Sequence, residues 1–120
     1  MKSNILYISI LLCAINFGLT VNSIGQTNKT ETIEFKVSGI CEMCKDRIET
    51  AALIRGVKFA EWNNETNIIK VVFNPQKTTT ETIHKSIAKA GHDTEAIKAD
   101  NVDYDKLSDC CKYRENSEKH

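Results

Sequence analysis

The alternation of hydrophobic and polar residues predicts a strand and then a helix in the first part of the folded region. Residues 33–37 (IEFKV) alternate apolar and polar side chains, which predicts a half-buried strand that ends at Ser38 and Gly39. Residues 44–55 instead place apolar side chains three or four positions apart, with charged side chains between them. That spacing predicts a helix with one apolar face, which Gly56 ends.

Two further runs of β-branched and aromatic residues predict a β-hairpin. Residues 57–62 and 68–73 have the composition of strands, and the polar segment 63–67 between them suits a turn. Pro75 has no N–H to donate to a strand ladder, so we expect the sheet segment to end there.

A second helix and a short last strand complete the pattern. Thr78 and Glu81 fit a capping box, which predicts a helix with Thr78 as its N-cap and its end at Gly91. His84 is expected at an exposed or boundary position of this helix, without a role. Residues 94–98 predict the last strand. The resulting order indicates an α+β, ferredoxin-like βαββαβ fold, with two helices on one face of a four-stranded antiparallel sheet.

The N-terminal segment has the charge pattern of an export signal. Lys2 precedes an apolar run over residues 5–15, and no further charged residue occurs in the segment. Residues 23–25 (SIG) form a small-x-small site, which predicts cleavage after residue 25. We therefore expect a secreted or periplasmic protein.

This interpretation divides the chain into a signal peptide (1–25), a domain (26–99) and a cysteine-containing C-terminal tail (100–120). An uncleaved membrane anchor is the alternative, but polar residues interrupt the apolar run short of the ~20 residues that a spanning helix needs. A lipoprotein that uses Cys13 is a further alternative, against which Leu12 stands where such signals carry a small residue. After cleavage we expect no membrane attachment.

Length and charge exclude several classes of protein. The 120 residues leave room for one core, which excludes a multidomain enzyme. The sixteen basic and sixteen acidic residues give a formal charge of zero, so a nucleic-acid partner is not expected. The sequence contains no Ser-His-Asp arrangement, glycine-rich phosphate loop or paired-carboxylate cleft, and we predict that the protein is not an enzyme.

Cys41 and Cys44 are the main chemical feature of the sequence. They lie at the predicted junction of strand and helix, where free backbone N–H groups and the helix dipole favour thiolates. Two thiolates at this spacing suit a single soft ion such as Cu(I). Redox enzymes and zinc sites also use a Cys-x-x-Cys pair, so the spacing alone leaves those uses open.

Residues 37–44 (VSGICEMC), followed by RIE at 47–49 and GV at 56–57, resemble the heavy-metal-associated domain of copper chaperones, metal-transporting ATPases and the periplasmic mercury-binding protein. The resemblance covers most of the predicted domain. It implies the βαββαβ fold, metal binding by Cys41 and Cys44, and transfer of the ion to a partner domain by thiol exchange.

The loop that carries Cys41 and Cys44, called the metal loop below, departs from the family pattern in its length. Only Ile40 separates Gly39 from Cys41, where the family has a methionine and a variable residue, so the loop is one residue shorter and lacks the buried methionine. We expect Ile40 to fill the apolar space below the site. Met43, inside the motif, is expected to face solvent, with a thioether ligand as the alternative.

His92 is a further candidate residue. It follows Gly91 in the loop after the second predicted helix, and the resemblance implies that this loop approaches the metal loop. His92 is therefore a candidate third ligand or a hydrogen-bond donor that modulates the charge of the site. The alternative is an exposed loop histidine.

The tail is expected to be loop-like, docked on the sheet or helices by Tyr104 and Leu107. Its adjacent cysteines, Cys110 and Cys111, can seldom bridge each other. Three uses remain open for them: extra soft ligands folded over the Cys-x-x-Cys pair, a disulfide to that pair, or a second metal site. We favour tail thiols that reach the metal loop.

The leading hypothesis is an exported metallochaperone that binds Cu(I) and hands it to a metal-transporting or metal-receiving protein, as a monomer or a metal-bridged dimer. Hg(II) scavenging by the same thiols is the close alternative, and Zn(II) also suits cysteine ligands. A thiol-disulfide redox protein and a domain stabilised by structural disulfides are alternatives from other classes. No aromatic residue directly precedes Cys41, and Pro75 is the single proline, which stands against the redox protein.

Overall fold

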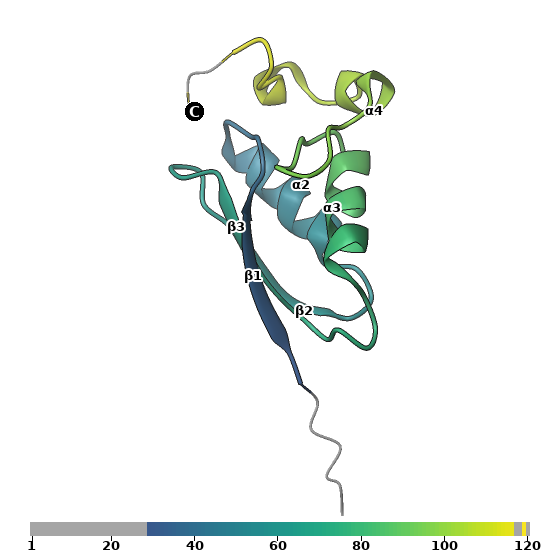
Figure 1. Cartoon of the computed structure of the whole chain (residues 1–120). Coiled ribbons are helices and arrows are strands. Elements are labelled where there is room, and N and C mark those ends of the chain that lie inside the picture. The colour runs from purple at the N-terminus through teal and green to yellow at the C-terminus, as the bar shows by residue number, and fades with distance from the viewer. Residues whose placement is uncertain (1–28, 117–118, 120) are drawn as a thin grey trace, which may run out of the picture.

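The computed structural model describes residues 29–116 and 119. The predicted signal peptide, with Cys13, lies outside the described residues. Within the described ranges, no helix combines the length and the apolar character that a bilayer crossing requires. The described chain forms a sheet covered by helices, and the tail lies across one end of them (Figure 1).

Three antiparallel strands form the sheet: β1 (Glu31–Lys36), β2 (Val57–Trp62) and β3 (Ile68–Phe73). Their order is β1-β3-β2, so the second hairpin strand is central and pairs with both neighbours. Phe35 lies opposite Ile69 in this register. The hairpin strands have the bounds expected from their β-branched and aromatic residues.

Two helices cover one face of the sheet: α2 (Glu42–Ala52) and α3 (Thr80–Lys89) (Figure 1). α2 begins directly after Cys41, whose Sγ accepts a hydrogen bond from the backbone N–H of Cys44 at 3.4 Å. The metal-loop cysteine is therefore itself the N-cap of the helix. α2 ends a few residues before Gly56, which lies in the following turn with a φ of 95°.

The N-cap of α3 is Thr79, so the expected cap at Thr78 is wrong by one residue. The Oγ1 of Thr79 accepts a hydrogen bond from the N–H of Thr82 at 3.1 Å. Glu81 does not act as the second half of a capping box but pairs with Lys85 one turn along, at 2.9 Å. Three consecutive threonines leave the register of the cap ambiguous in the sequence.

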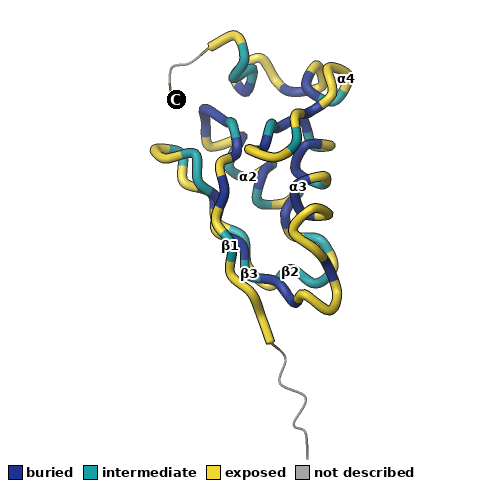
Figure 2. Tube along the Cα trace, in the orientation of Figure 1, coloured by how far each residue is buried: buried dark blue, intermediate teal, exposed yellow. Residues whose placement is uncertain are grey.

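The hydrophobic core lies between the sheet and the two helices (Figure 2). Strands and helices both contribute fully buried side chains. They include Trp62, Ile69, Val71, Ile48, Ile83 and Ile87. Burial of one such side chain contributes about 1.5–3 kcal/mol. The same contacts fix the position of α2 and, with it, the cysteines at its N-terminus.

His84 belongs to this buried region, which corrects the expectation that it is exposed or at a boundary. It is 6% exposed, and its Nδ1 lies 2.6 Å from the Oγ1 of Thr94. Its ring centroid lies 3.9 Å from that of Phe35. Burial lowers the pKa of His84, so the side chain is a neutral part of the packing.

The expected strand over residues 94–98 is not confirmed. In the described structure this segment makes one isolated bridge, between Val37 and Thr94. The chain then turns, because the N–H of Thr94 donates to the carbonyl of Ile97 and its Oγ1 accepts from the N–H of Ile97. A threonine that bonds to nearby backbone in this way competes with strand pairing. The α+β class is confirmed, with a three-stranded sheet and a single bridge.

The tail contains two short helices where a loop was expected. α4 (Asn101–Asp105) and the 3-10 helix η2 (Asp109–Cys111) run across the end of the molecule at which α2 begins (Figure 1). Tyr104 and Leu107 are both 4% exposed and belong to the hydrophobic core cluster. The expectation that these two residues dock the tail is confirmed.

Candidate metal site

The loop before α2 packs closely against the sheet. The indole N–H of Trp62 donates to the carbonyl of Val37 at 3.0 Å. A Cβ at Gly39 would lie 3.0 Å from the Trp62 ring and 3.1 Å from the Cβ of Cys44, so a side chain at this position would displace its neighbours. Ile40 is 4% exposed, in agreement with its expected place below the site. The shortened loop is therefore held by packing on both sides.

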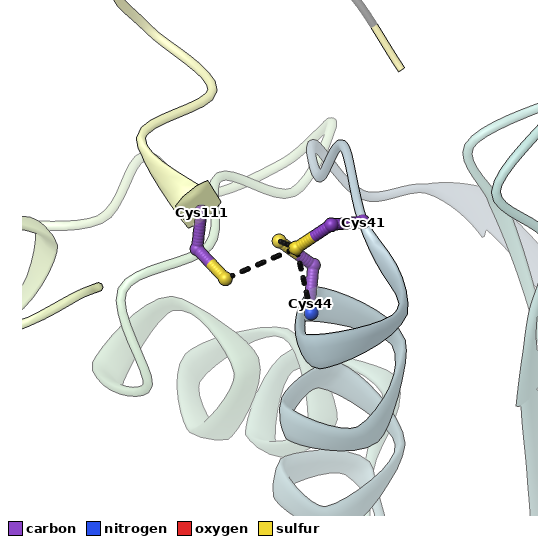
Figure 3. Close-up of side chains that lie close together, drawn as sticks. All are labelled: Cys41, Cys44 and Cys111. Carbon is purple, nitrogen blue, oxygen red and sulfur yellow. Dashed lines mark hydrogen bonds between the residues drawn. The ribbon is translucent and has the colours of Figure 1, made fainter. Parts of the chain in front are cut away.

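The sulfurs of Cys41 and Cys44 lie 3.1 Å apart at the N-terminus of α2 (Figure 3). One residue caps the helix and the other lies in its first turn, so their side chains turn toward the same point. Both are buried, with exposed fractions of 6% and 0%. The spacing of the motif thus produces the paired thiols that the sequence predicted.

The tail adds a third thiol to this pair. The Sγ of Cys111 lies 3.2 Å from the Sγ of Cys41, and Cys111 is fully buried. Figure 3 shows its side chain descending from η2 toward the two sulfurs at the start of α2. The three sulfurs all lie within 4.8 Å of one another. We call Cys41, Cys44 and Cys111 the three-thiol cluster.

The three thiols differ in their tendency to lose a proton. Burial raises the pKa of Cys41, but hydrogen bonds from Cys44 and Cys111 and from backbone N–H groups outweigh it and leave the pKa below its ordinary value. Burial raises the pKa of Cys44, and it raises that of Cys111 well above the ordinary range. The predicted lowering at the helix N-terminus is therefore found at Cys41 and is wrong at Cys44. Of the three thiols, Cys41 is therefore the one that loses its proton most readily.

An ion pair holds the tail over the cluster. The Arg114 guanidinium forms two hydrogen bonds with the Asp93 carboxylate, Nη2 to Oδ1 at 2.7 Å and Nε to Oδ2 at 3.2 Å. Each side chain is about one-fifth exposed. The same guanidinium lies over the Tyr104 ring, 4.3 Å from its centroid. This bidentate pair joins the tail to the loop after α3 and holds the pKa of Asp93 below its ordinary value, despite the opposing effect of burial.

Tyr113 forms the second attachment of the tail. Its hydroxyl donates to the carbonyl of Gly91 at 2.7 Å and accepts from the N–H of Asp93 at 2.8 Å. Gly91 has a φ of 102°, and a Cβ there would lie 2.8 Å from the carbonyl oxygen of Asp103. The absence of a side chain at Gly91 is therefore needed both for the turn and for the close approach of the tail.

His92 is fully buried next to the metal loop, so the alternative of an exposed loop histidine is wrong. Its Nδ1 lies 2.8 Å from the carbonyl of Ser38, which fixes the proton on Nδ1, and its ring stacks on Tyr113. Its Nε2 has no hydrogen-bond partner among residues 29–116 and 119. Burial lowers its pKa to about 4. The three-thiol cluster does not include it, and its expected role as a ligand stays a prediction.

Met43 and Cys110 lie at the rim of the cluster. Met43 is 50% exposed, as expected for a solvent-facing residue of the motif. The thiol of Cys110 is exposed and lies 3.5 Å from the Sδ of Met43. The four cysteines of the described residues all carry free thiols. The structure therefore separates the adjacent tail cysteines into a buried residue of the cluster and an exposed one.

Sequence reasoning missed the residues that place the tail. No motif or pattern of the sequence singles out Tyr113, Asp93 or Arg114. No local signal marks the pair of Asp93 and Arg114, because its two members lie far apart in the chain and each resembles an ordinary surface charge.

An α+β sandwich with a Cys-x-x-Cys pair at a strand-to-helix junction defines a small metal-binding domain of the copper-chaperone type. A sequence model of the heavy-metal-associated domain matches residues 34–93, half of the chain, and the chain belongs to that family. The match ends before the tail, so Cys111 lies outside the segment that the family model covers.

Three known proteins illustrate the likeness. The copper chaperone CopZ of Staphylococcus epidermidis is 38% identical over 60 residues, which cover 48% of this chain and 88% of CopZ. Oxidized MerP from Ralstonia metallidurans CH34 is 28% identical, with a TM-score of 0.53 over 56% of this chain and 96% of MerP. The N-terminal domain of a potential copper-translocating P-type ATPase from Bacillus subtilis, solved in the Cu(I)-loaded state, is 29% identical, with a TM-score of 0.52 over 55% of this chain and 85% of that one.

Proposed function

We propose that this protein is an exported metallochaperone that binds Cu(I) as its cargo and passes it to a metal-transporting or metal-receiving protein. The observation that carries the proposal is the three-thiol cluster, whose sulfurs all lie within 4.8 Å of one another. Cys41 and Cys44 supply the pair expected of the family, and Cys111 adds a thiol from the tail. Three buried sulfurs form a donor set for a soft ion and a poor one for Mg²⁺ or Ca²⁺.

The relatives support copper as the cargo. The matched chaperone is described as a copper chaperone, and the matched ATPase domain was solved with Cu(I) bound. Hg(II) is the close alternative because it favours the same thiolates, and Zn(II) also binds cysteine. A competition among the three ions on the reduced protein separates these cargoes.

Transfer to a partner domain is the proposed mode of action. Ligand exchange requires only that a thiol of the partner replaces a thiol of the donor, so no catalytic group is needed and we propose no enzymatic activity. Cys41 is suited to pass the ion between the thiols of the cluster, because its pKa is lowered and its sulfur contacts both other thiols. The matched copper-translocating ATPase domain indicates the kind of partner that could receive the ion.

Export is proposed from the sequence alone. The basic residue, apolar run and small-x-small site of residues 1–25 predict secretion or a periplasmic location. The molecular mass of the protein recovered from its host tests this part: loss of residues 1–25 supports export with cleavage, and retention contradicts it.

Anaerobic titration of the reduced full chain with Cu(I), against a chromophoric chelator, tests the metal site. We expect tight binding of one ion per chain, abolished by Cys41→Ser and weakened at least about tenfold by Cys111→Ser. Cys110→Ser is the matched control, since it removes the neighbouring thiol that lies outside the cluster, and its equilibrium affinity should equal that of the wild type. Binding no tighter than that of free thiols would overturn the proposal and would direct attention to the redox potential of the Cys41 and Cys44 pair.

A further inference from the structure

Two exposed sulfur atoms meet at the surface above the three-thiol cluster. Met43, in the first turn of α2, presents its thioether to solvent and is 50% exposed. Cys110, in η2, presents an exposed thiol, and its Sγ lies 3.5 Å from the Sδ of Met43. The two residues belong to segments far apart in the chain, so only the docked tail brings them together. We call Met43 and Cys110 the rim pair.

The rim pair is connected to the buried cluster by successive short sulfur-to-sulfur distances. The Sγ of Cys110 lies 3.9 Å from that of Cys111, which lies 3.2 Å from that of Cys41. The Sγ of Cys41 lies in turn 3.1 Å from that of Cys44. A continuous row of sulfur atoms therefore leads from the solvent to the fully buried thiol of Cys44.

The three-thiol cluster is almost inaccessible from solvent except along this row of sulfur atoms. Cys44 and Cys111 are fully buried and Cys41 is 6% exposed, so an ion or a partner thiol has almost no direct access to them. Direct access would require the tail to leave, which would break the paired hydrogen bonds between Arg114 and Asp93. Of the four cysteine sulfurs described, that of Cys110 is the exposed one.

We propose that the rim pair is a second, weaker site for soft monovalent ions, Cu(I) above all, through which the ion reaches and leaves the three-thiol cluster. This inference rests on the proposed function, because it needs the cluster to bind the ion. A neutral thioether and one thiol bind a soft ion less strongly than three thiols, so the ion is captured at the rim and moves inward.

Each step of this route is a ligand exchange without a change of oxidation state. Cys110 loses its thiol proton to solvent when its sulfur binds Cu(I), and Met43 contributes a lone pair without losing a proton. When the ion moves inward, Cys111 loses its proton and forms the new metal–sulfur bond. The bonds to Met43 and Cys110 then break, and the Cys110 thiol takes a proton back from solvent.

Stopped-flow transfer of Cu(I) from a chromophoric chelator to the reduced full chain tests the route. The variant combines Met43→Leu with Cys110→Ser, two exposed positions where these changes leave the packed core intact. The control is Ser108→Ala, an exposed position next to the rim pair that carries no sulfur. Thermal unfolding of all three proteins establishes that the fold is unchanged.

We expect the double variant to keep one-to-one stoichiometry and the wild-type equilibrium affinity, but to take up and release Cu(I) about tenfold more slowly. The control should match the wild type. In a titration with Ag(I), a redox-inert soft ion, the wild type should bind a second, weaker equivalent that the double variant lacks. Equal transfer rates in the wild type and the double variant would overturn this inference. A wild type that fails to bind Cu(I) would instead overturn the proposed function.

Discussion

The Sγ of Cys111 lies 3.2 Å from the Sγ of Cys41, although 70 positions separate the two residues in the chain. This contact converts the Cys-x-x-Cys loop into a buried cluster of three thiols. Under the proposed function, it also makes the tail part of the metal site and not an appendage of the domain. Both the affinity for a soft ion and the access to it then depend on how firmly the tail is docked.

Removal of the tail's ion pair should open the cluster. Arg114→Gln loses the two charge-assisted hydrogen bonds to Asp93, and we expect the buried thiols to become at least about tenfold more reactive toward iodoacetamide as the tail detaches more often. Mass spectrometry of the metal-free protein reports the modification of Cys111.

Lys85→Gln is the control for this experiment, because it breaks the exposed pair with Glu81, in which the two side chains are 65% and 71% exposed. Such a surface pair contributes little to stability, so the cysteines of Lys85→Gln should be alkylated at the wild-type rate. An unchanged alkylation rate in Arg114→Gln would show that the ion pair does not hold the tail.

Gly91→Ala should destabilise the protein and loosen the tail at the same time. The φ of 102° is unfavourable for alanine, and the added Cβ would lie 2.8 Å from the carbonyl oxygen of Asp103 in α4. We expect a loss of about 1–3 kcal/mol in the free energy of unfolding, measured by urea denaturation. Wild-type stability in this variant would mean that the tail does not approach the loop as closely as the structure shows.

The elements of the fold were predictable where the signal is local. The hairpin strands follow from runs of β-branched and aromatic residues, and the position of the paired thiols follows from the spacing of Cys41 and Cys44 before an amphipathic helix. The single-residue error at the α3 cap arose from three consecutive threonines. The missing strand after Gly91 has a local cause too, since the hydroxyl of Thr94 binds nearby backbone and turns the chain.

The completion of the site could not be predicted in the same way. The sequence marked Cys111 as a candidate but left three uses open, because its position depends on contacts with residues far away in the chain. Tyr113 and Arg114 place it through hydrogen bonds to Gly91 and Asp93. The spacing of hydrophobic residues in the sequence indicates neither hydrogen bond. The burial of His84 and His92 was hidden for the same reason.

The stability of the metal-free protein should fall in acid partly through His92. Burial lowers its pKa to about 4, below the ordinary value of 6.5. Between these two pH values, the unfolded chain binds a proton at this residue and the folded protein does not. The contribution of neutral His92 to the free energy of unfolding is therefore fully present above pH 6.5. It is lost as the pH falls toward 4, and the loss amounts to about 3 kcal/mol.

Urea denaturation of the reduced protein and of His92→Gln, at several pH values between 7 and 4, measures this loss. The comparison concerns the slope of stability against pH, so a lower stability of the variant at pH 7 does not affect it. The variant should lose about 3 kcal/mol less than the wild type over this range. Parallel curves would contradict a buried, neutral His92.

The coordination number of bound Cu(I) tests the central claim most directly. X-ray absorption spectroscopy at the copper edge counts the sulfur neighbours of the ion in the loaded protein. The three-thiol cluster predicts three sulfur ligands in the wild type and in Cys110→Ser, and two in Cys111→Ser. Two sulfur ligands in all three proteins would contradict it, and would reduce the site to the Cys41 and Cys44 pair alone.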